Sequence, residues 1–280
     1  MLLNKETLSE ELIEEHINLA LKCAGDEPTE INYKIRYSSN EPLRDLFSKF
    51  SVEGKRAIVV LSSGDHYFYA KNYGAMSVDA IDINPLTYYY AGFRKCWMNH
   101  FGTFYPGRIF IFDKYVFKAA LDLFLGGLDI RDKERDAIYQ FWCGYLERVD
   151  DKQHQNLFYD GDYSNELCFD TTPPKSLYSF DEPLNFYQQD LTKEFRCDKE
   201  YDIAVLSNLI EQYCMDKDKL IVIRDNLNAL LSDDGKAICS CCCRKDMTEL
   251  EKQIFGECFD SELYYGSNNR LIGYQLSKRC

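Results

Sequence analysis

The sequence predicts an α/β protein with a doubly wound, mostly parallel sheet that a helical insertion interrupts. Residues 57–61 (AIVVL) form a continuous β-branched run of the kind that fills a buried parallel strand. An alternation of strand, turn and helix follows, breaks over residues 105–180 and then resumes. Residues 259–276 close the chain as two strand-like segments joined by a polar turn, the pattern of a hairpin.

The individual helices and strands are predicted from the spacing of hydrophobic residues and from the capping and turn residues that bound them. Thr7 with Glu10 matches a capping box at the start of an amphipathic helix, and Gly25 marks its end. The expected helices are residues 7–24, 43–50, 66–73, 85–99, 115–125, 131–146, 216–231 and 246–255. The expected strands are residues 57–61, 78–83, 184–188, 201–206, 236–242, 259–265 and 271–276.

These seven strands make a Rossmann-like sheet whose parallel part ends in an antiparallel hairpin. That ending is typical of the class I S-adenosylmethionine-dependent methyltransferase type of fold. The domain prediction is an N-terminal helical segment at residues 1–50, a cofactor-binding domain at 51–104 and 181–280, and a helical insertion at 105–180. The insertion is the expected acceptor-binding cap.

Composition narrows the class of function. The chain has 280 residues, of which 45% are hydrophobic and 28% are charged, a globular balance that excludes disorder. Its net charge is -13, so binding to nucleic acid would gain no free energy from the release of phosphate counterions. Duplex nucleic acid is therefore not expected as the partner. No window approaches 18 consecutive apolar residues, so no transmembrane helix is expected.

The acidic N-terminal region lacks the pattern of a secretory signal, so we expect a cytoplasmic protein. The 12 cysteines are then reduced thiols. Cys239, Cys241, Cys242 and Cys243 lie on an expected strand, where alternate side chains point to opposite faces. Because that geometry hinders convergence on one zinc ion, we expect these thiols to pack as small hydrophobic groups, and we predict no metal site.

Polar residues follow each expected strand, where doubly wound sheets bind ligands. Ser62, Ser63, Gly64 and Asp65 form a small-residue turn after the first strand. His66 and Tyr67 stand where a dinucleotide fingerprint has glycines, so a cofactor without pyrophosphate fits better than a nicotinamide dinucleotide. S-adenosylmethionine is such a cofactor, and Asp65 is a candidate acceptor for its amine. The alternative is an ordinary tight turn.

Asp82 ends the second strand 18 residues after Gly64, near the spacing at which a carboxylate takes ribose hydroxyls. Ile83 and Asn84 complete this site, although Asn84 also suits a helix cap. Further strand-end candidates are Asp190 and Leu191 for the adenine, and Ser207 and Asn208 beneath the sulfonium.

The run SSGDHYFYAKNYGAMSVDAIDINP, at residues 62–85, resembles the diacylglycerol 3-amino-3-carboxypropyltransferase family of betaine-lipid synthesis. YSSNEP at 37–42 and FLGGLDIRDKERDAIYQFW at 124–142 are similar to segments of the same family. The resemblance implies S-adenosylmethionine as cofactor and transfer of an aminocarboxypropyl group to a small or lipid-like acceptor. It implies a cofactor-binding role for Ser63, Gly64, Asp65, Asp82, Asn84 and Asp190. Members usually have two glycines before the aspartate, and Ser63 takes the first place here.

Two other functions fit the same residues: methyl transfer to an unknown acceptor, and cofactor binding without catalysis. No catalytic residue is assigned. Candidate bases are His66, His100, His154 and the loop at residues 159–163, but buried or surface histidines are usually structural. Residues 1–32 hold eight acids and two bases, and residues 150–170 hold six acids and one base. This acidity favours a neutral or cationic acceptor over an anionic lipid surface.

Overall fold

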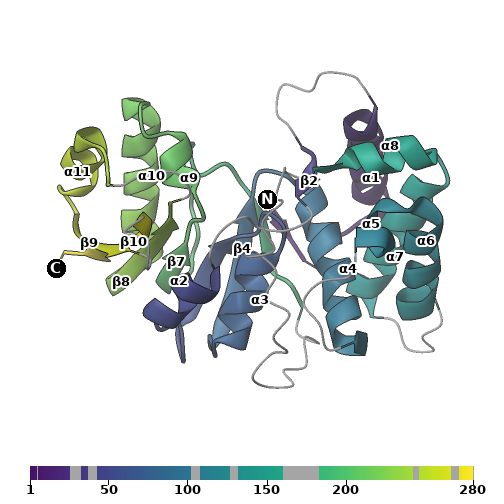
Figure 1. Cartoon of the computed structure of the whole chain (residues 1–280), viewed down its shortest axis with the longest axis horizontal. Coiled ribbons are helices and arrows are strands. Elements are labelled where there is room, and N and C mark those ends of the chain that lie inside the picture. Colours follow the sequence, from purple (N-terminus) through teal and green to yellow (C-terminus); the bar gives the residue numbers. More distant parts are fainter. Residues whose placement is uncertain are drawn as a thin grey trace. The chain divides into compact units, whose positions relative to one another are not determined.

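The structure is a computed structural model of the whole chain, shown in Figure 1. It describes residues 1–4, 6–25, 33–36, 43–101, 108–126, 132–159, 183–241, 246–265 and 271–279. The chain forms two compact units that are interleaved in sequence. The first comprises Met1–Ser39, Leu61–Asp65 and Asn84–Gln188, and the second comprises Asn40–Val60, His66–Ile83 and Gln189–Cys280.

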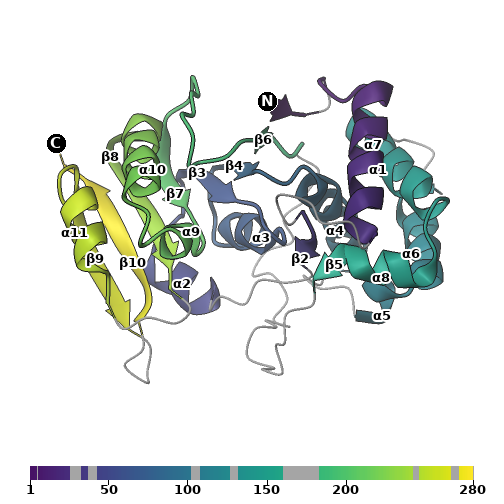
Figure 2. The same cartoon turned by 90° about the horizontal axis from the view of Figure 1, so that it is seen from above.

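The second unit contains a mixed sheet whose described strands lie in the order β4-β3-β7-β8-β10-β9. These strands are β3 (Arg56–Val60), β4 (Ser77–Asp82), β7 (Tyr201–Val205), β8 (Leu231–Ser240), β9 (Phe259–Tyr265) and β10 (Leu271–Lys278). In the parallel part, Val59 of β3 is paired with Ala80 of β4 on one side and with Val205 of β7 on the other. Strand β10 runs antiparallel to both β8 and β9, which makes the C-terminal hairpin (Figure 2).

Helices of the second unit are α2 (Leu43–Lys49), α3 (Asp65–Asn72, except its first residue), α9 (Leu209–Gln212), α10 (Lys217–Leu230) and α11 (Glu249–Phe255). Asp216 caps α10 by accepting a hydrogen bond from the Lys219 amide. Thr248 and Glu251 form a capping box that starts α11. Helices α10 and α11 lie side by side, as Figures 1 and 2 both show.

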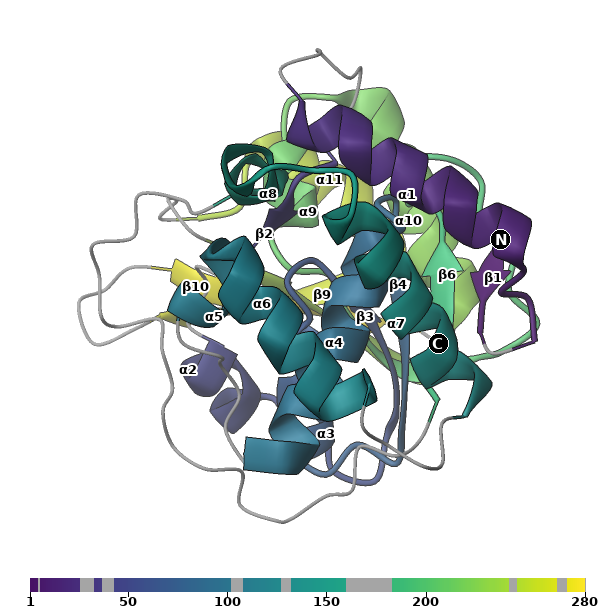
Figure 3. The same cartoon turned by 90° about the vertical axis from the view of Figure 1, so that its right-hand side faces the viewer.

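The first unit is mainly helical. Its helices are α1 (Glu10–Ala24), α4 (Leu86–Phe101), α5 (Arg108–Phe112), α6 (Lys114–Leu121), a π-helical turn (Asp122–Gly126), α7 (Lys133–Leu146) and α8 (Asp151–Leu157). Two short strand pairs accompany them: β1 (Leu2–Leu3) with β6 (Phe186–Gln188), antiparallel, and β2 (Ile35–Arg36) with β5 (Phe158–Tyr159), parallel. Helix α1 packs along α7 (Figure 3).

Helix α4 is buried on most of its circumference. Tyr88, Tyr89 and Tyr90 are all fully buried although consecutive helical residues point in different directions. The Tyr89 ring stacks on Phe141 of α7 with centroids 3.8 Å apart, and the Tyr90 ring meets Phe158 edge to face. A helix that is covered on several sides keeps its side chains in fixed rotamers, so α4 is a rigid support for the groups it carries.

The predicted α/β class with a doubly wound sheet is confirmed, and all seven predicted strands form. The structure adds α5, α9, β1, β2 and β5 to the expected elements, and three further details differ. Helix α1 starts one turn later than expected, because the Ser9 hydroxyl caps it by accepting from the Leu12 amide. Helix α8 stands where no helix was expected, since Asp150 and Gln153 form a capping box. Strand β8 begins at Leu231, with an irregularity in its pairing to β7.

No helix among the described residues is long and apolar enough to cross a membrane.

Candidate functional site

The turn after β3 is tightly closed and has an unusual backbone. The Gly64 amide donates to the Leu61 carbonyl at 2.6 Å. Ser62 has φ of 49° and Gly64 has φ of 91°, both in the left-handed region. For a non-glycine residue this conformation costs about 1–3 kcal/mol, and it persists only where the surroundings hold it.

A buried ionic cluster in the first unit supplies those surroundings. The Asp65 carboxylate accepts from the Ser63 hydroxyl at 2.6 Å and is paired with the Arg94 guanidinium of α4 at 2.7 Å. Arg94 also donates to the Ser63 carbonyl at 2.6 Å. All three residues are at most 1% exposed, so the Asp65 carboxylate is closed off from solvent. The contact of Asp65 with a cofactor amine stays a prediction, and Arg94 is a residue that the sequence pattern did not single out.

Asn84 follows β4 and starts α4. Its Oδ1 accepts from the Leu86 amide at 3.0 Å, and its Nδ2 donates to the Tyr33 carbonyl at 2.8 Å. The Asn84 carbonyl accepts from the Thr87 hydroxyl at 2.7 Å. Asn84 therefore acts as a helix cap in the first unit, which is the structural alternative that the sequence left open.

In the second unit, the end of β4 lies beside the segment that follows β6. The Gln189 amide donates to the Asp82 carbonyl at 2.9 Å, so Asp82 and Gln189 are neighbours. Asp82 and Ile83 are partly exposed at this strand end. The structure thus brings together the residues predicted for the ribose and the segment predicted for the adenine.

Asp190 begins a short loop that is hydrogen-bonded to Asn226 of α10. The Asp190 Oδ1 accepts from the amide and the hydroxyl of Thr192, at 2.9 and 2.6 Å. Asn226 on α10 donates through Nδ2 to the carbonyls of Leu191 (2.9 Å) and Lys193 (2.7 Å). Its Oδ1 accepts from the Phe195 amide at 3.0 Å.

Asn226 is 5% exposed, and a lone asparagine in a helix gives no sequence signal for such a role. Its only hint is a polar residue at a position where the helical period expects a buried one.

The turn after β7 repeats the backbone feature of the turn after β3. Ser207 has φ of 56°, and its carbonyl accepts from the Ser240 amide at 3.0 Å. The next residue, Asn208, accepts from the Gln212 Nε2 at 3.0 Å and from the Ser207 hydroxyl at 3.4 Å. Ser207 and Asn208 thus stand together at the end of β7 in the second unit.

The turns after β3 and β7 follow the two strands that flank the switch point of the sheet. From β3 the chain continues to β4 on one side, whereas β7 lies on the other side of β3. The gap between the carboxyl ends of β3 and β7 is therefore a switch point, the place where open α/β sheets bind ligands. Ser62 follows β3 by two residues and Ser207 follows β7 by two, so each flanking strand leads into a strained serine.

The histidines are mostly buried. His154 bonds the Ile111 carbonyl through Nε2 at 2.8 Å, and His16 bonds the Tyr89 hydroxyl at 2.9 Å. Burial lowers the pKa of each to about 4, so both rings are neutral at pH 7. His66 is fully buried, and His100 packs on Phe124. These positions suit packing better than proton transfer to a bound substrate.

Residues 160–163 of the candidate loop at 159–163 lie outside the described residues. The same is true of Cys242 and Cys243. Cys239 and Cys241 are both buried, as is Ser240 between them, because β8 is covered on both faces there. Within the described part of the chain, no group of three or more His, Cys, Asp or Glu side chains could hold a metal ion.

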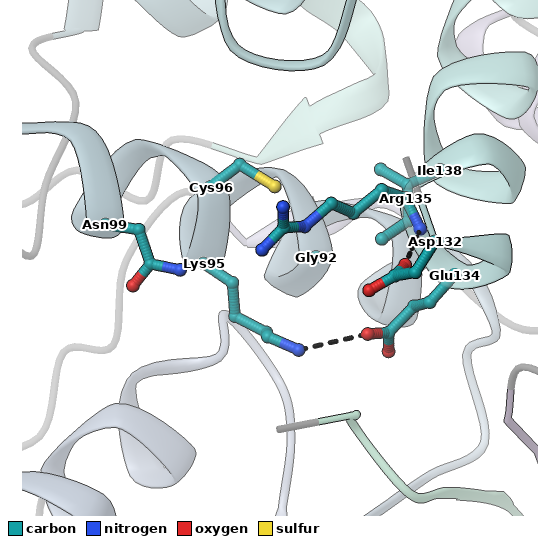
Figure 4. Close-up of a pocket in the computed structure, with 8 residues that line it drawn as sticks. All are labelled: Gly92, Lys95, Cys96, Asn99, Asp132, Glu134, Arg135 and Ile138. Atoms are coloured by element: carbon teal, nitrogen blue, oxygen red, sulfur yellow. Dashed lines mark hydrogen bonds and ion pairs between the residues drawn. The ribbon is translucent and has the colours of Figure 1, made fainter. Parts of the chain in front are cut away.

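A pocket lies between α4 and α7 in the first unit (Figure 4). It is lined by Gly92, Lys95, Cys96, Asn99, Asp132, Glu134, Arg135 and Ile138. Lys95 and Glu134 face each other across it with an Nζ–Oε2 distance of 3.1 Å. Burial raises the pKa of the Cys96 thiol to about 11, so the thiol is protonated and a weak nucleophile at pH 7.

No family model matches the chain, and no curated protein matches it. Solved structures do resemble it. The N-methyltransferase NodS from Bradyrhizobium japonicum WM9 is 11% identical, with a TM-score of 0.40 over 98% of this chain and 100% of that one. A TehB-like SAM-dependent methyltransferase from Corynebacterium glutamicum is 10% identical, with a TM-score of 0.42 over 97% and 100%. A methyltransferase from Pyrococcus furiosus is 8% identical, with a TM-score of 0.44 over 95% and 98%.

Because all three TM-scores are below 0.5, the assignment of the fold depends on this chain's own strand order and pairing. Those features make it an α/β chain with a doubly wound sheet and an antiparallel C-terminal hairpin.

Proposed function

We propose that this protein is an S-adenosylmethionine-dependent transferase. The observation that carries the proposal is the left-handed serine after each strand that flanks the switch point, Ser62 after β3 and Ser207 after β7. Backbone strain of this kind clusters at ligand-binding sites, and the switch point is where a doubly wound sheet binds its ligand.

The identity of the cofactor follows from the chemistry of the turn. His66 and Tyr67 stand near the start of α3, at the sequence positions where a dinucleotide fingerprint has the glycines that let a pyrophosphate approach. S-adenosylmethionine has no phosphate. The antiparallel hairpin of β9 and β10 at the end of a parallel sheet, typical of class I transferases that use this cofactor, supports the same choice.

The proposed contacts follow the strand ends. Asp82 takes the two ribose hydroxyls, with Ile83 beside it, and Asp190 and Leu191 bind the adenine. Ser207 and Asn208 lie by the sulfonium. Ser62, Ser63 and Gly64, which follow β3 after Leu61, are the proposed contacts for the amino-acid tail of the cofactor. Asn84, two residues after Asp82 in the chain, caps α4.

The transferred group is proposed from the resemblance to the aminocarboxypropyltransferases. An acceptor nucleophile attacks the Cγ carbon of the aminocarboxypropyl group, the S–Cγ bond breaks, methylthioadenosine leaves, and the acceptor loses a proton. Because the sulfonium is already an activated leaving group, alignment contributes most, up to about 7–11 kcal/mol of the barrier. Methyl transfer is the second candidate: attack at the methyl carbon breaks the S–CH₃ bond and releases S-adenosylhomocysteine.

Isothermal titration of the full chain with S-adenosylmethionine tests the cofactor. Asp82→Asn is expected to weaken binding about 10–100-fold, because hydrogen bonds to a charged acceptor contribute about 1.5–3 kcal/mol. Asp218→Asn, at an exposed position on α10, is the matched control and leaves the affinity unchanged. Absence of binding by the wild type overturns the proposal, and equal affinities of the two variants remove Asp82 from it.

Chromatography of the products then separates the two reactions. We expect methylthioadenosine to accumulate when a neutral or cationic acceptor is supplied. S-adenosylhomocysteine in its place identifies a methyltransferase. Binding without release of either product over long incubations, with neutral, cationic and lipid-like acceptors in turn, indicates a binding protein that lacks catalysis.

A further inference from the structure

Arg94 is a fully buried arginine that is paired with two residues of the turn after β3. Its Nη1 donates to the Ser63 carbonyl at 2.6 Å, and its Nη2 is paired with the Asp65 Oδ1 at 2.7 Å. The other carboxylate oxygen of Asp65 accepts from the Ser63 hydroxyl at 2.6 Å. One guanidinium therefore holds both the backbone and a side chain of the same three-residue segment.

Only arginine suits this geometry. A planar guanidinium reaches two acceptors at once in fixed directions, whereas a lysine ammonium is a single point on a flexible stem. A guanidinium that is removed from water is tolerated when a carboxylate and hydrogen-bond acceptors replace the solvent, and Asp65 and the Ser63 carbonyl supply both. The Tyr90 ring, 5.8 Å from the Arg94 Cζ, covers another side of the group.

These contacts leave the Ser63–Gly64 peptide no freedom to rotate. Its carbonyl accepts from Arg94, and its N–H donates to the Leu61 carbonyl at 2.6 Å. Both neighbours of Ser63 have left-handed φ values, so the turn would relax to a more ordinary conformation without such restraint. The turn is thus preformed, with its shape imposed from the helix behind it.

Helix α4, which carries Arg94, is itself fixed to α7. Lys95, the next residue of α4, is paired with the buried Glu134 of α7 at 3.1 Å (Figure 4). Glu134 also accepts from the Tyr88 hydroxyl at 3.1 Å and from the Leu184 amide at 2.9 Å. Helix α4 is therefore fixed to α7 and to the segment that leads into β6, which gives Arg94 a rigid base.

We propose that Arg94 is a positioning residue for cofactor binding, and that Asp65 serves as its counter-ion and does not bind the cofactor amine. The inference depends on the proposed use of S-adenosylmethionine. It assigns the shape of the binding turn to a helix that follows the next strand, and it changes the role of Asp65 from ligand contact to internal partner.

Two variants separate this role from direct binding by Asp65. Arg94→Lys keeps the charge but loses the simultaneous reach to the Ser63 carbonyl, and it is expected to weaken S-adenosylmethionine binding about tenfold. The combined Asp65→Asn, Arg94→Gln variant removes both buried charges and keeps two amide groups that can bond each other and the turn. We expect its affinity to stay within fivefold of the wild type.

Affinities come from isothermal titration, with cooperative thermal unfolding as the check that each variant is folded. Arg148→Lys is the control, because Arg148 makes an exposed pair with Glu14. An Arg94→Lys affinity within fivefold of the wild type overturns the positioning role. If the folded Asp65→Asn, Arg94→Gln variant loses more than fivefold in affinity, the counter-ion role is overturned. Such a loss is expected if the Asp65 carboxylate binds the cofactor amine directly.

Hydrogen exchange without ligand tests the preformed turn independently of cofactor chemistry. In the combined Asp65→Asn, Arg94→Gln variant, whose two amides still bond the turn, amides of the segment Ser62–Asp65 should exchange within fivefold of their rate in Arg148→Lys. In Arg94→Lys they should exchange at least tenfold faster than in Arg148→Lys. Unchanged exchange in Arg94→Lys overturns the inference. A wild type that binds no S-adenosylmethionine overturns the proposed function instead, whatever the exchange rates show.

Discussion

The turns after β3 and β7 share a left-handed serine but are held in different ways. The first is fixed by a buried ion pair between Asp65 and Arg94, with every partner at most 1% exposed. The second is held by hydrogen bonds of Asn208 at 3.0 and 3.4 Å and by the bond from the Ser240 amide to the Ser207 carbonyl at 3.0 Å. We therefore expect the first turn to depend strongly on one charged partner, whereas the second depends on hydrogen bonds between neutral groups.

The largest expected effect comes from removing the Asp65 carboxylate from the first turn, compared with removing the Asn208 amide from the second. Asp65→Ala leaves Arg94 buried without its counter-ion, so the free energy of unfolding is expected to fall by about 3–5 kcal/mol. Asn208→Ala loses two partly exposed hydrogen bonds and is expected to cost about 1 kcal/mol or less. Chemical denaturation of both variants measures the contrast, and equal losses would contradict it.

The stability of the first unit should also fall at acidic pH, because this unit buries two neutral histidines, His16 and His154. The pKa values of His16 and His154 are about 4 in the folded state against a usual 6.5, so the unfolded chain binds more protons between these values. Stability is fully present above about pH 6.5 and falls as the pH drops towards 4, by up to about 3 kcal/mol for each ring.

Denaturation at a series of pH values between 7 and 4.5 checks this expectation. His16→Gln and His154→Gln should each flatten the slope of stability against pH. His100→Gln, at an exposed position on α4, is the control. If the slope of all three variants matches that of the wild type, the buried rings are not its source.

Asn226 in the second unit is buried and holds the loop after Asp190 by hydrogen bonds, so it should behave like the Asp65–Arg94 cluster on a smaller scale. Asn226→Ala removes three hydrogen bonds to the loop after Asp190, and at about 1 kcal/mol each the expected loss of stability is about 2–3 kcal/mol. The affinity for S-adenosylmethionine should fall with it, because the loop carries the proposed adenine contacts.

Asn228→Ala on the same helix is the matched control, since that side chain is exposed. If titration shows the two alanine variants to bind the cofactor equally well, the Asn226 hydrogen bonds have no part in the site.

The smallest expected effect concerns the backbone strain that both turns share. At Ser62 and at Ser207, the glycine variant should be more stable than the alanine variant by about 1 kcal/mol, because only alanine has a Cβ that opposes a left-handed φ. Comparing glycine with alanine cancels the loss of the hydroxyl. Thermal unfolding of the four variants measures the difference, and a preference for alanine at either position would show that the strain is relieved elsewhere.

The local pattern determined the seven strands, most helix positions and the polar residues after each strand, because hydrophobic period and turn chemistry act over a few residues. It could not locate the Ser9 cap precisely, since Thr7 offers similar chemistry two residues earlier. It also missed α8, whose capping box lies within the acidic stretch of residues 150–170.

The sequence by itself determined that small and acidic residues follow the strands of a doubly wound sheet. Only the tertiary structure decided which partners those residues take. Asp65 and Arg94 are 29 residues apart, and Asn226 donates to the carbonyl of Leu191, 35 residues earlier. Such pairings depend on how helices pack on the chain around them, and a guanidinium or an amide finds its acceptors only when burial has excluded water as an alternative.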